Sequence, residues 1–255
     1  MGKIPFPDVL RIEPASACNL NCIHCPNSGG GVMTEKTFSL VMEEMKRVIP
    51  RVVVMYHGGE PLLCRSLWKW VKRIKQLGVY SVKVTTNGTL IDNIRDIVNS
   101  KVDLMEVSID GISPEENDFI RRGSDCQAVI GNVLRLLDNK ITVTIANTQF
   151  SAQPVIPSFL VDVFGDRVKY RTTPVISWDS PRSIKNGSCS LLDETMTIRW
   201  NGDVVPCCYD ITSKYVMGNI HEASLKEIRG KSYGRIAQGI RENNPVNLCK
   251  GCLQK

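Results

Sequence analysis

The chain has 255 residues, of which 42% are hydrophobic and 23% are charged, and its formal net charge is +6. These proportions are typical of a globular, soluble protein with an apolar core. The length allows one large α/β domain or a medium domain with a small appendix. The basic residues form no run with interleaved aromatic residues, so we expect no nucleic-acid partner.

The N-terminal sequence MGKIPFPDVLRIEP contains no apolar signal region. No later stretch approaches the roughly 20 apolar residues that a membrane-spanning helix needs. Without an export signal, the ten cysteines are expected in a reducing compartment, where cysteines serve as metal ligands more often than as disulfides. We therefore expect a cytoplasmic protein that does not bind membranes.

The first two thirds of the chain alternate between predicted strands and predicted helices. Short runs rich in β-branched residues predict strands at 8–14, 51–56, 80–86, 103–109, 141–147 and 167–173. Segments with helical periodicity predict helices at 34–49, 65–78, 90–100, 128–139 and 154–165, the first with Thr34 as N-cap. Helices of this length between strands indicate βαβ units and a parallel sheet. Six repeats, two fewer than a closed eightfold barrel needs, predict an α/β fold with a partial (β/α)6 barrel.

The alternation ends near residue 173, and the remaining chain is rich in turn-forming residues. The segment TMTIRWNGDVVPCCYD predicts a β-hairpin that turns at Asn201-Gly202, because Asn-Gly between alternating apolar runs favours a tight turn. The segment 224–240 predicts a helix. We therefore divide the chain into a partial barrel, residues 1–173, and a small hairpin and helix domain, residues 174–255.

Three cysteines, Cys18, Cys22 and Cys25, follow the first predicted strand at spacings of four and three. Three thiolates can bind three irons of a [4Fe–4S] cluster and leave the fourth iron open to another ligand. A structural zinc loop, or thiols unrelated to each other, is the alternative, although zinc sites usually contain C-x2-C pairs.

The spacing C-x3-C-x2-C resembles the signature of radical S-adenosylmethionine (radical SAM) enzymes. The resemblance implies that Cys18, Cys22 and Cys25 hold a [4Fe–4S] cluster whose open iron binds SAM. An electron from that cluster then cleaves SAM into methionine and a 5′-deoxyadenosyl radical. The resemblance also places His24 against the adenine, because this family has an aromatic residue before the last cysteine.

A second motif, Gly58-Gly59-Glu60-Pro61, follows the second predicted strand. Consecutive glycines allow close backbone approach, and an adjacent carboxylate can pair with an ammonium group. In radical SAM enzymes the matching motif binds the amino group of SAM. The resemblance also assigns to the SAM pocket residues at or after the ends of later strands: Thr86, Asn87, Ser108, Asp110, Arg121 and Arg122, with Ile145 and Asn147 as weaker candidates. Ordinary turn residues, or a solvated helix end for the arginines, are the alternative.

Four further cysteines, Cys189, Cys207, Cys249 and Cys252, lie in the C-terminal block. Four thiolates can fully ligate a second [4Fe–4S] cluster. The block resembles the twitch domain, a shortened form of the SPASM auxiliary domain of radical SAM enzymes, and in particular that of the aminocyclitol dehydrogenase of butirosin biosynthesis. The resemblance implies that these four cysteines ligate one auxiliary cluster. A four-cysteine zinc ribbon is the alternative.

A cluster with four protein ligands has no vacant iron, so it is suited to moving electrons. We therefore expect an oxidoreductase in which the 5′-deoxyadenosyl radical removes a hydrogen from a carbon bearing a hydroxyl or amine. The auxiliary cluster would accept the remaining electron, which makes the enzyme a dehydrogenase. The expected substrate is an aminocyclitol or sugar-like small molecule or a peptide, and the expected electron donor is a flavodoxin or ferredoxin.

Several alternatives stay open at this point. A radical epimerase would need a cysteine as hydrogen donor, for which Cys64, Cys126 and Cys208 remain, although buried cysteines often serve only as small apolar residues. A peptide-modifying maturase, an iron–sulfur electron carrier and a zinc-binding interaction module are the others. Polar or aromatic residues near the end of the barrel are candidates for binding the substrate or acting as its base: Arg171, Trp178, Asp179, Arg182 and Glu194.

Overall fold

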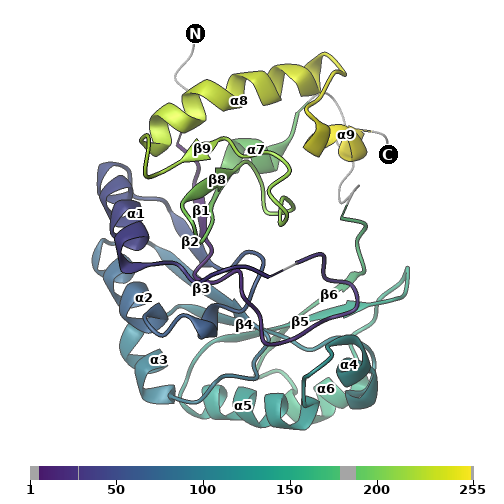
Figure 1. Cartoon of the computed structure of the whole chain (residues 1–255). Helices are drawn as coiled ribbons and strands as arrows, with labels where there is room; N and C mark the ends of the chain where they lie inside the picture. Colours follow the sequence, from purple (N-terminus) through teal and green to yellow (C-terminus); the bar gives the residue numbers. More distant parts are fainter. Residues whose placement is uncertain (1–5, 28, 179–187, 254–255) are drawn as a thin grey trace.

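The structure, a computed structural model, describes residues 6–27, 29–178 and 188–253. Its centre is a sheet with the strand order β6-β5-β4-β3-β2-β1-β7-β8-β9. The first six strands are parallel neighbours, and helices lie along their outer side (Figure 1). This arrangement is the predicted α/β fold, and it fits an open, partial barrel.

The barrel strands are β1 (Val9–Ile12), β2 (Val52–Met55), β3 (Ser81–Thr86), β4 (Leu104–Ser108), β5 (Val143–Gln149) and β6 (Lys169–Pro174). The helices between them are α1 (Glu35–Arg47), α2 (Leu67–Gln76), α3 (Ile94–Ser100), α4 (Pro114–Ile120), α5 (Cys126–Asp138) and α6 (Ser158–Phe164), with the 3-10 helix η1 (Pro61–Leu63). All six predicted strands and all five predicted barrel helices are therefore confirmed.

Side-chain caps decide where several of these helices begin. Thr34 is the N-cap of α1, as predicted, and its side chain accepts a hydrogen bond from the backbone N–H of Thr37. Asn93 and Asp125 cap α3 and α5 in the same way, which shifts both starts away from those predicted by periodicity. The short helix α4, capped by Ser113, was not predicted, because its large apolar residues, Phe119 and Ile120, are adjacent and give no helical period.

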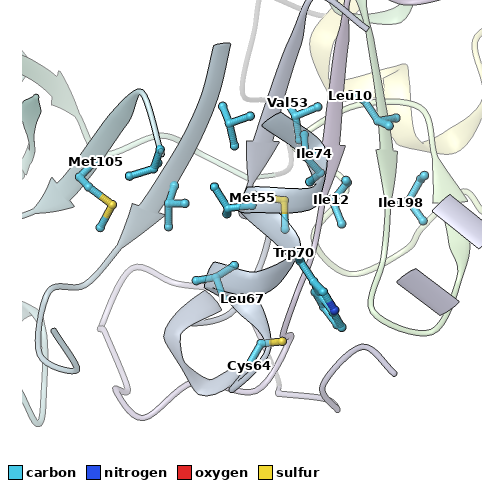
Figure 2. Packing of buried hydrophobic residues seen from close by; sticks show 14 of the residues in the cluster. Leu10, Ile12, Val53, Met55, Cys64, Leu67, Trp70, Ile74, Met105 and Ile198 are labelled. Carbon is cyan, nitrogen blue, oxygen red and sulfur yellow. The ribbon is translucent and has the colours of Figure 1, made fainter. Parts of the chain in front are cut away.

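The apolar core lies between the sheet and its outer helices. Met55 of β2 and Leu67, Trp70 and Ile74 of α2 are buried within it (Figure 2). The ring of Trp70 stacks on that of Phe38 from α1, with the ring centroids 4.3 Å apart. Burying such large side chains stabilises the fold by about 1.5–3 kcal/mol each, and it holds the strand ends that carry the site.

The C-terminal part extends the same sheet. It comprises α7 (Ser190–Glu194), β7 (Thr195–Ile198), β8 (Asp203–Val205), β9 (Gly218–Asn219), α8 (Leu225–Arg241) and α9 (Asn247–Leu253). Strand β7 pairs in parallel with β1, and β8 returns antiparallel to β7. The predicted hairpin is confirmed, and Gly202 in its turn has a φ of +90°, which favours glycine.

The division of the chain at residue 173 stays a prediction, because the sheet runs continuously from β6 through β1 into β9. Helix α8 lies on the hairpin side of the molecule, away from α3, α5 and α6 (Figure 1). In the part of the chain that the structure describes, no helix is both long and apolar enough to span a membrane.

Candidate cofactor-binding sites

A cavity of about 300 Å³ opens where the barrel strands end. In parallel strands the carboxyl ends meet at one edge of the sheet, so the loops that follow them converge there. The cavity brings together most of the predicted residues: Cys18, Cys22, His24, Cys25, Gly58, Gly59, Glu60, Thr86, Asn87, Ser108, Asp110 and Arg121.

Gly59 lets the second loop pack against the cysteine-bearing loop. A Cβ at this position would lie 2.4 Å from the carbonyl oxygen of Ala17 and 2.5 Å from that of Ala15. The next residue, Glu60, donates its backbone N–H to Ala17 over 2.9 Å. The glycine is therefore needed for close contact within the protein itself, while Pro61 begins η1 and does not line the cavity.

The carboxylate of Glu60 is buried and held by three donors. Its Oε1 accepts from the hydroxyl of Thr86 at 2.7 Å and from the N–H of Leu62 at 2.9 Å, and its Oε2 accepts from the N–H of Asn87 at 2.8 Å. Burial raises the pKa of Glu60, and these hydrogen bonds oppose the rise. The carboxylate is thus a fixed acceptor at the cavity wall, suited to an ammonium group.

Thr86 and Asn87 hold other protein groups in place. The Thr86 hydroxyl donates to Glu60, and the side-chain amide of Asn87 donates to the side-chain oxygen of Asn19 at 2.9 Å. Both residues therefore orient the glutamate and the cysteine loop, in addition to lining the cavity.

Asp110 and Arg121 form an ion pair at the cavity wall, with Nη1 of the arginine 2.6 Å from Oδ2 of the aspartate. The backbone N–H of Thr148 donates to the other aspartate oxygen. Burial alone would lower the pKa of Arg121, but the carboxylate of Asp110 raises it above its usual range. Arg122 is exposed and does not line the cavity, so Arg121 is the arginine that reaches it.

Unsatisfied polar atoms in this cavity fit a polar ligand. Among the described residues, Nδ1 of His24 and Nε of Arg121 are buried without a hydrogen-bond partner. Buried polar atoms normally have partners. The thiols of Cys18, Cys22 and Cys25 form no disulfide and can ligate a cluster. These thiols and the two polar atoms together fit SAM bound to an iron–sulfur cluster.

The four C-terminal cysteines meet at a second cavity, of about 40 Å³. Cys189, Cys207, Cys249 and Cys252 line it with apolar residues of α7, α8 and α9. Burial raises the pKa of Cys207 and raises that of Cys249 to about 12, so metal uptake would displace protons. Within the described ranges, no three His, Cys, Asp or Glu side chains are grouped as ligands of a single metal ion. A cluster with an iron at each corner instead requires thiols spread around a cavity.

The remaining cysteines, the predicted candidates for a hydrogen donor, lie outside both cavities. Cys64 is buried in the core near Leu67 and Trp70 (Figure 2), and Cys126 is buried at the start of α5. Burial raises the pKa of these thiols to about 11 and about 12. Neither lines either of the two cavities, and the half-buried Cys208 does not line them either. Packing in the apolar core turns the first two away from the cavities.

The candidates for substrate binding have different positions. Arg171 and Trp178 line the first cavity, and the indole N–H of Trp178 donates to the carbonyl of His24 at 2.9 Å. Glu194 is exposed at the end of α7 and is absent from the lining of that cavity. Asp179 and Arg182 lie outside the described residues.

Sequence reasoning missed Glu106, Tyr56 and Tyr209, which also line the first cavity. Glu106 could have been found, because a charged residue between the apolar Met105 and Val107 of a predicted strand points to the opposite face. Tyr209 offered no such signal, because its position depends on the packing of the C-terminal part. The weaker candidates Ile145 and Asn147 are buried, and their neighbours in β5 line the cavity instead.

Comparison with protein families gives two matches along the chain. Residues 12–149 match the model of the radical SAM superfamily. Residues 189–253 match the model of SPASM, an iron–sulfur cluster-binding domain. The first match contains the cysteine triplet and Glu60, and the second contains the four cysteines of the second cavity.

Curated proteins match over part of the chain. The probable GTP 3′,8-cyclase of Methanothermobacter thermautotrophicus is 29% identical over 133 residues, which are 51% of this chain and 44% of that protein. The GTP 3′,8-cyclase of Limosilactobacillus fermentum is 30% identical over 145 residues, 54% of this chain and 42% of that protein. The chain thus spans less than half the length of these relatives.

Solved structures match over nearly the whole chain. BtrN in complex with AdoMet and 2-DOIA has a TM-score of 0.68 and 18% identity, covering 98% of this chain and 96% of that one. SuiB of Streptococcus suis bound to the precursor peptide SuiA has a TM-score of 0.65 and 17% identity, covering 92% and 67%. At these identities the likeness shows the fold alone.

Proposed function

Because this chain belongs to the radical SAM superfamily, we propose that it is a dehydrogenase that acts on a carbon bearing a hydroxyl or amine. The radical SAM and SPASM domains imply SAM and [4Fe–4S] clusters as cofactors. When bound, SAM and its cluster supply the 5′-deoxyadenosyl radical that removes a hydrogen from the substrate. The enzyme class follows from the family, and the reaction is our proposal.

The first cavity has groups for each part of SAM. Cys18, Cys22 and Cys25 would ligate the cluster through their thiolates. The fixed carboxylate of Glu60 would accept hydrogen bonds from the SAM ammonium, and Arg121 would bind the SAM carboxylate while Asp110 holds its guanidinium in place. His24 and Ser108, which also line the cavity, would contact the nucleoside.

One observation favours dehydrogenation: the two cavities share a wall. Trp178 and Tyr209 line both of them, and their rings meet edge to face with centroids 6.3 Å apart. Removing one hydrogen atom from a carbon leaves one electron and one proton to lose if a double bond is to form, and the proton passes to a base. A [4Fe–4S] cluster bound by Cys189, Cys207, Cys249 and Cys252 could accept this electron. The rings of Trp178 and Tyr209 would separate that cluster from the substrate.

The similarity to GTP 3′,8-cyclases supports SAM chemistry but not their substrate, because it covers only about half of the chain. A small molecule, sugar-like or an aminocyclitol, fits the likeness to BtrN, and a peptide fits the likeness to SuiB. We favour the small molecule, because BtrN matches over nearly its whole length. A reduced flavodoxin or ferredoxin would supply the electron that starts the reaction.

The test is an anaerobic incubation of the reconstituted protein with SAM, dithionite and a panel of polyols, sugar acids, sugar phosphates, aminocyclitols and peptides. We expect one equivalent each of 5′-deoxyadenosine and methionine for each product, and a product two hydrogens lighter than the substrate by mass spectrometry. A product of unchanged mass that carries solvent deuterium would show an epimerase instead. SAM left intact would contradict radical SAM chemistry, as expected for a mere electron carrier.

A further inference from the structure

The strand register places charged residues on the concave face of the sheet. Arg11 of β1 is paired with Val54 of β2, and Val54 is paired with Lys83 of β3. The residues beside Arg11, Lys83 and Glu106 in the sequence are apolar and belong mostly to the core under the outer helices. Side chains alternate between the faces of a strand, so these three charged side chains share the inner face.

Glu106 is the centre of a charged cluster on this face. Its carboxylate lies 3.1 Å from Nζ of Lys83 and 3.2 Å from Nη2 of Arg171, and the hydroxyl of Thr85 donates to it at 3.2 Å. We name Arg11, Lys83, Glu106 and Arg171 the inner basic cluster. Lys83 and Arg171 share the carboxylate of Glu106, and Arg11 is close enough for its charge to act on Lys83, so the cluster carries two positive charges in excess.

The cations of the inner basic cluster act on one another. Burial lowers the pKa of Lys83, and the charges of Arg11 and Arg171 lower it further, while Glu106 opposes them. Like charges held close together in a partly buried position repel one another. An anion bound beside this cluster would offset its excess charge.

Arg171 brings the inner basic cluster to the part of the cavity that SAM does not use. Thr85 of β3, Glu106 of β4 and Arg171 of β6 line the first cavity. Arg11 and Lys83 do not line it, and they act there through their charge. Elsewhere in that cavity we assign Arg121 to the SAM carboxylate and Glu60 to the SAM ammonium. The inner basic cluster therefore remains for the substrate, which Arg171 would contact directly.

We propose that the inner basic cluster binds an anionic group of the substrate, either a carboxylate or a phosphate. Arginine presents paired N–H donors that match both groups, and a partly buried position strengthens the attraction. The same charges repel the ammonium groups of an aminocyclitol, so the preferred substrate is a sugar acid, a sugar phosphate or a comparable small anion. This inference rests on the proposed function only in placing the substrate in this cavity.

The test measures anion binding by the reconstituted protein with SAM bound, using isothermal titration with inorganic phosphate and, separately, succinate. We expect at least one of them to bind, and the stronger of the two shows whether the natural group is a phosphate or a carboxylate. Arg171→Gln should weaken that binding at least tenfold, and Lys83→Met should do the same. Arg171 is half-exposed, so its substitution leaves the core intact and keeps the test valid if Lys83→Met fails to fold.

The matched control is Arg167→Gln, which removes an arginine paired with Asp138 on the surface and should leave the affinity unchanged. No binding of either anion, or equal binding by wild type and Arg171→Gln, would overturn the inference. Tighter binding of 2-deoxystreptamine than of both anions would overturn it as well. SAM cleavage by the wild type is a separate readout, so failure of anion binding and failure of the proposed function remain distinguishable.

Discussion

Glu13 and Arg199 join the barrel to the C-terminal hairpin through a buried ion pair, with Nε of the arginine 3.1 Å from Oε2 of the glutamate. Glu13 follows β1, and its other oxygen accepts the N–H of Gly58 at 3.0 Å. The backbone N–H of Trp200 also donates to Glu13, at 3.2 Å. One carboxylate therefore connects the first strand, the loop that carries Glu60 and the start of the hairpin.

Replacing Glu13 by alanine should strongly destabilise the protein. The substitution leaves the Arg199 guanidinium, whose side chain is 11% exposed, without its counter-charge. Removing one partner of a buried ion pair costs about 3–5 kcal/mol. Urea unfolding of the reconstituted protein would measure the loss. Glu43→Ala, which removes an exposed pair with Lys46, should cost less than about 0.5 kcal/mol. Similar losses for the two variants would contradict the role of Glu13.

Replacing Gly59 by alanine should displace the loop that carries Glu60. The new Cβ would meet the backbone oxygens of Ala15 and Ala17 well inside contact distance, and backbone atoms cannot move aside as a flexible side chain can. We expect weaker SAM binding and a loss of at least about 2 kcal/mol in the free energy of unfolding. SAM titration and urea unfolding would measure the two effects.

Gly131→Ala is the control for that substitution. Gly131 lies inside α5, and an added Cβ would meet no atom within 4 Å. The change should leave SAM affinity unaltered and raise the free energy of unfolding by up to about 1 kcal/mol, because alanine favours helix more than glycine does. If Gly59→Ala behaved like Gly131→Ala, the tight packing at Gly59 would be refuted.

Replacing Glu60 by glutamine should weaken SAM binding without unfolding the protein. The amide is similar in size, but it lacks the charge that would pair with the SAM ammonium, and charge-assisted hydrogen bonds contribute about 1.5–3 kcal/mol. Its NH2 group also cannot accept from the donors that hold Glu60, so a smaller loss of stability should accompany the change. We expect a 10- to 100-fold higher Kd for SAM, measured by titration of the anaerobic protein. Glu35→Gln on α1, which faces Arg73 outside the cavity, should bind SAM as the wild type does.

The adjacent cysteines Cys207 and Cys208 should differ in their effect on iron content. Cys207 lines the second cavity and Cys208 does not. Two [4Fe–4S] clusters correspond to about eight irons per chain. Cys207→Ala should lower the iron content toward about four, while Cys208→Ala should keep about eight, as measured by iron and sulfide analysis after anaerobic reconstitution. The reverse result would mean that Cys208 is the ligand.

His57 should make stability depend on pH. Burial lowers its pKa to about 3, with help from Arg11 and Arg199, while the hydrogen bond from its Nε2 to the carbonyl of Asp210 opposes the shift. Unfolded histidine has a pKa of about 6.5. Between these values the unfolded state binds more protons, so the free energy of unfolding falls as pH falls below about 6.5. We expect His57 to contribute about 2 kcal/mol less at pH 5 than at pH 7.

The check on His57 is urea unfolding at both pH values for wild type and His57→Gln. Glutamine keeps a donor for the carbonyl but does not titrate, so the wild type should lose about 2 kcal/mol more than the variant. The nearby Asp210, whose own pKa is raised by burial, titrates in both proteins. Its contribution to the pH dependence therefore cancels when the wild type is compared with His57→Gln. An equal loss in both proteins would show that His57 is not responsible.

Much of the fold and of the site could be predicted because the signals are local. The spacing of Cys18, Cys22 and Cys25 puts three thiols in one short loop, and the strand before it identifies the sheet edge where that loop lies. The hairpin at Gly202 and the cap at Thr34 follow in the same way from neighbouring residues. Covalent geometry and backbone preferences act over a few residues, so the sequence itself carries this information.

Other features depended on packing between distant segments, and the sequence left them open. The choice of Arg121 over Arg122 depends on which side chain the fold turns toward the cavity. Cys64 seemed close to the site along the chain, yet it lies in the core.

The sequence by itself determined the type of chemistry, because the cysteine spacings and the residues around Glu60 belong to short, contiguous motifs. Only the tertiary structure decided which charges lie at the end of the cavity that we assign to the substrate. Lys83, Glu106 and Arg171 come from three strands, and the register of the sheet brings them together. Register is set by the packing of the whole sheet against its helices, and no local pattern determines it.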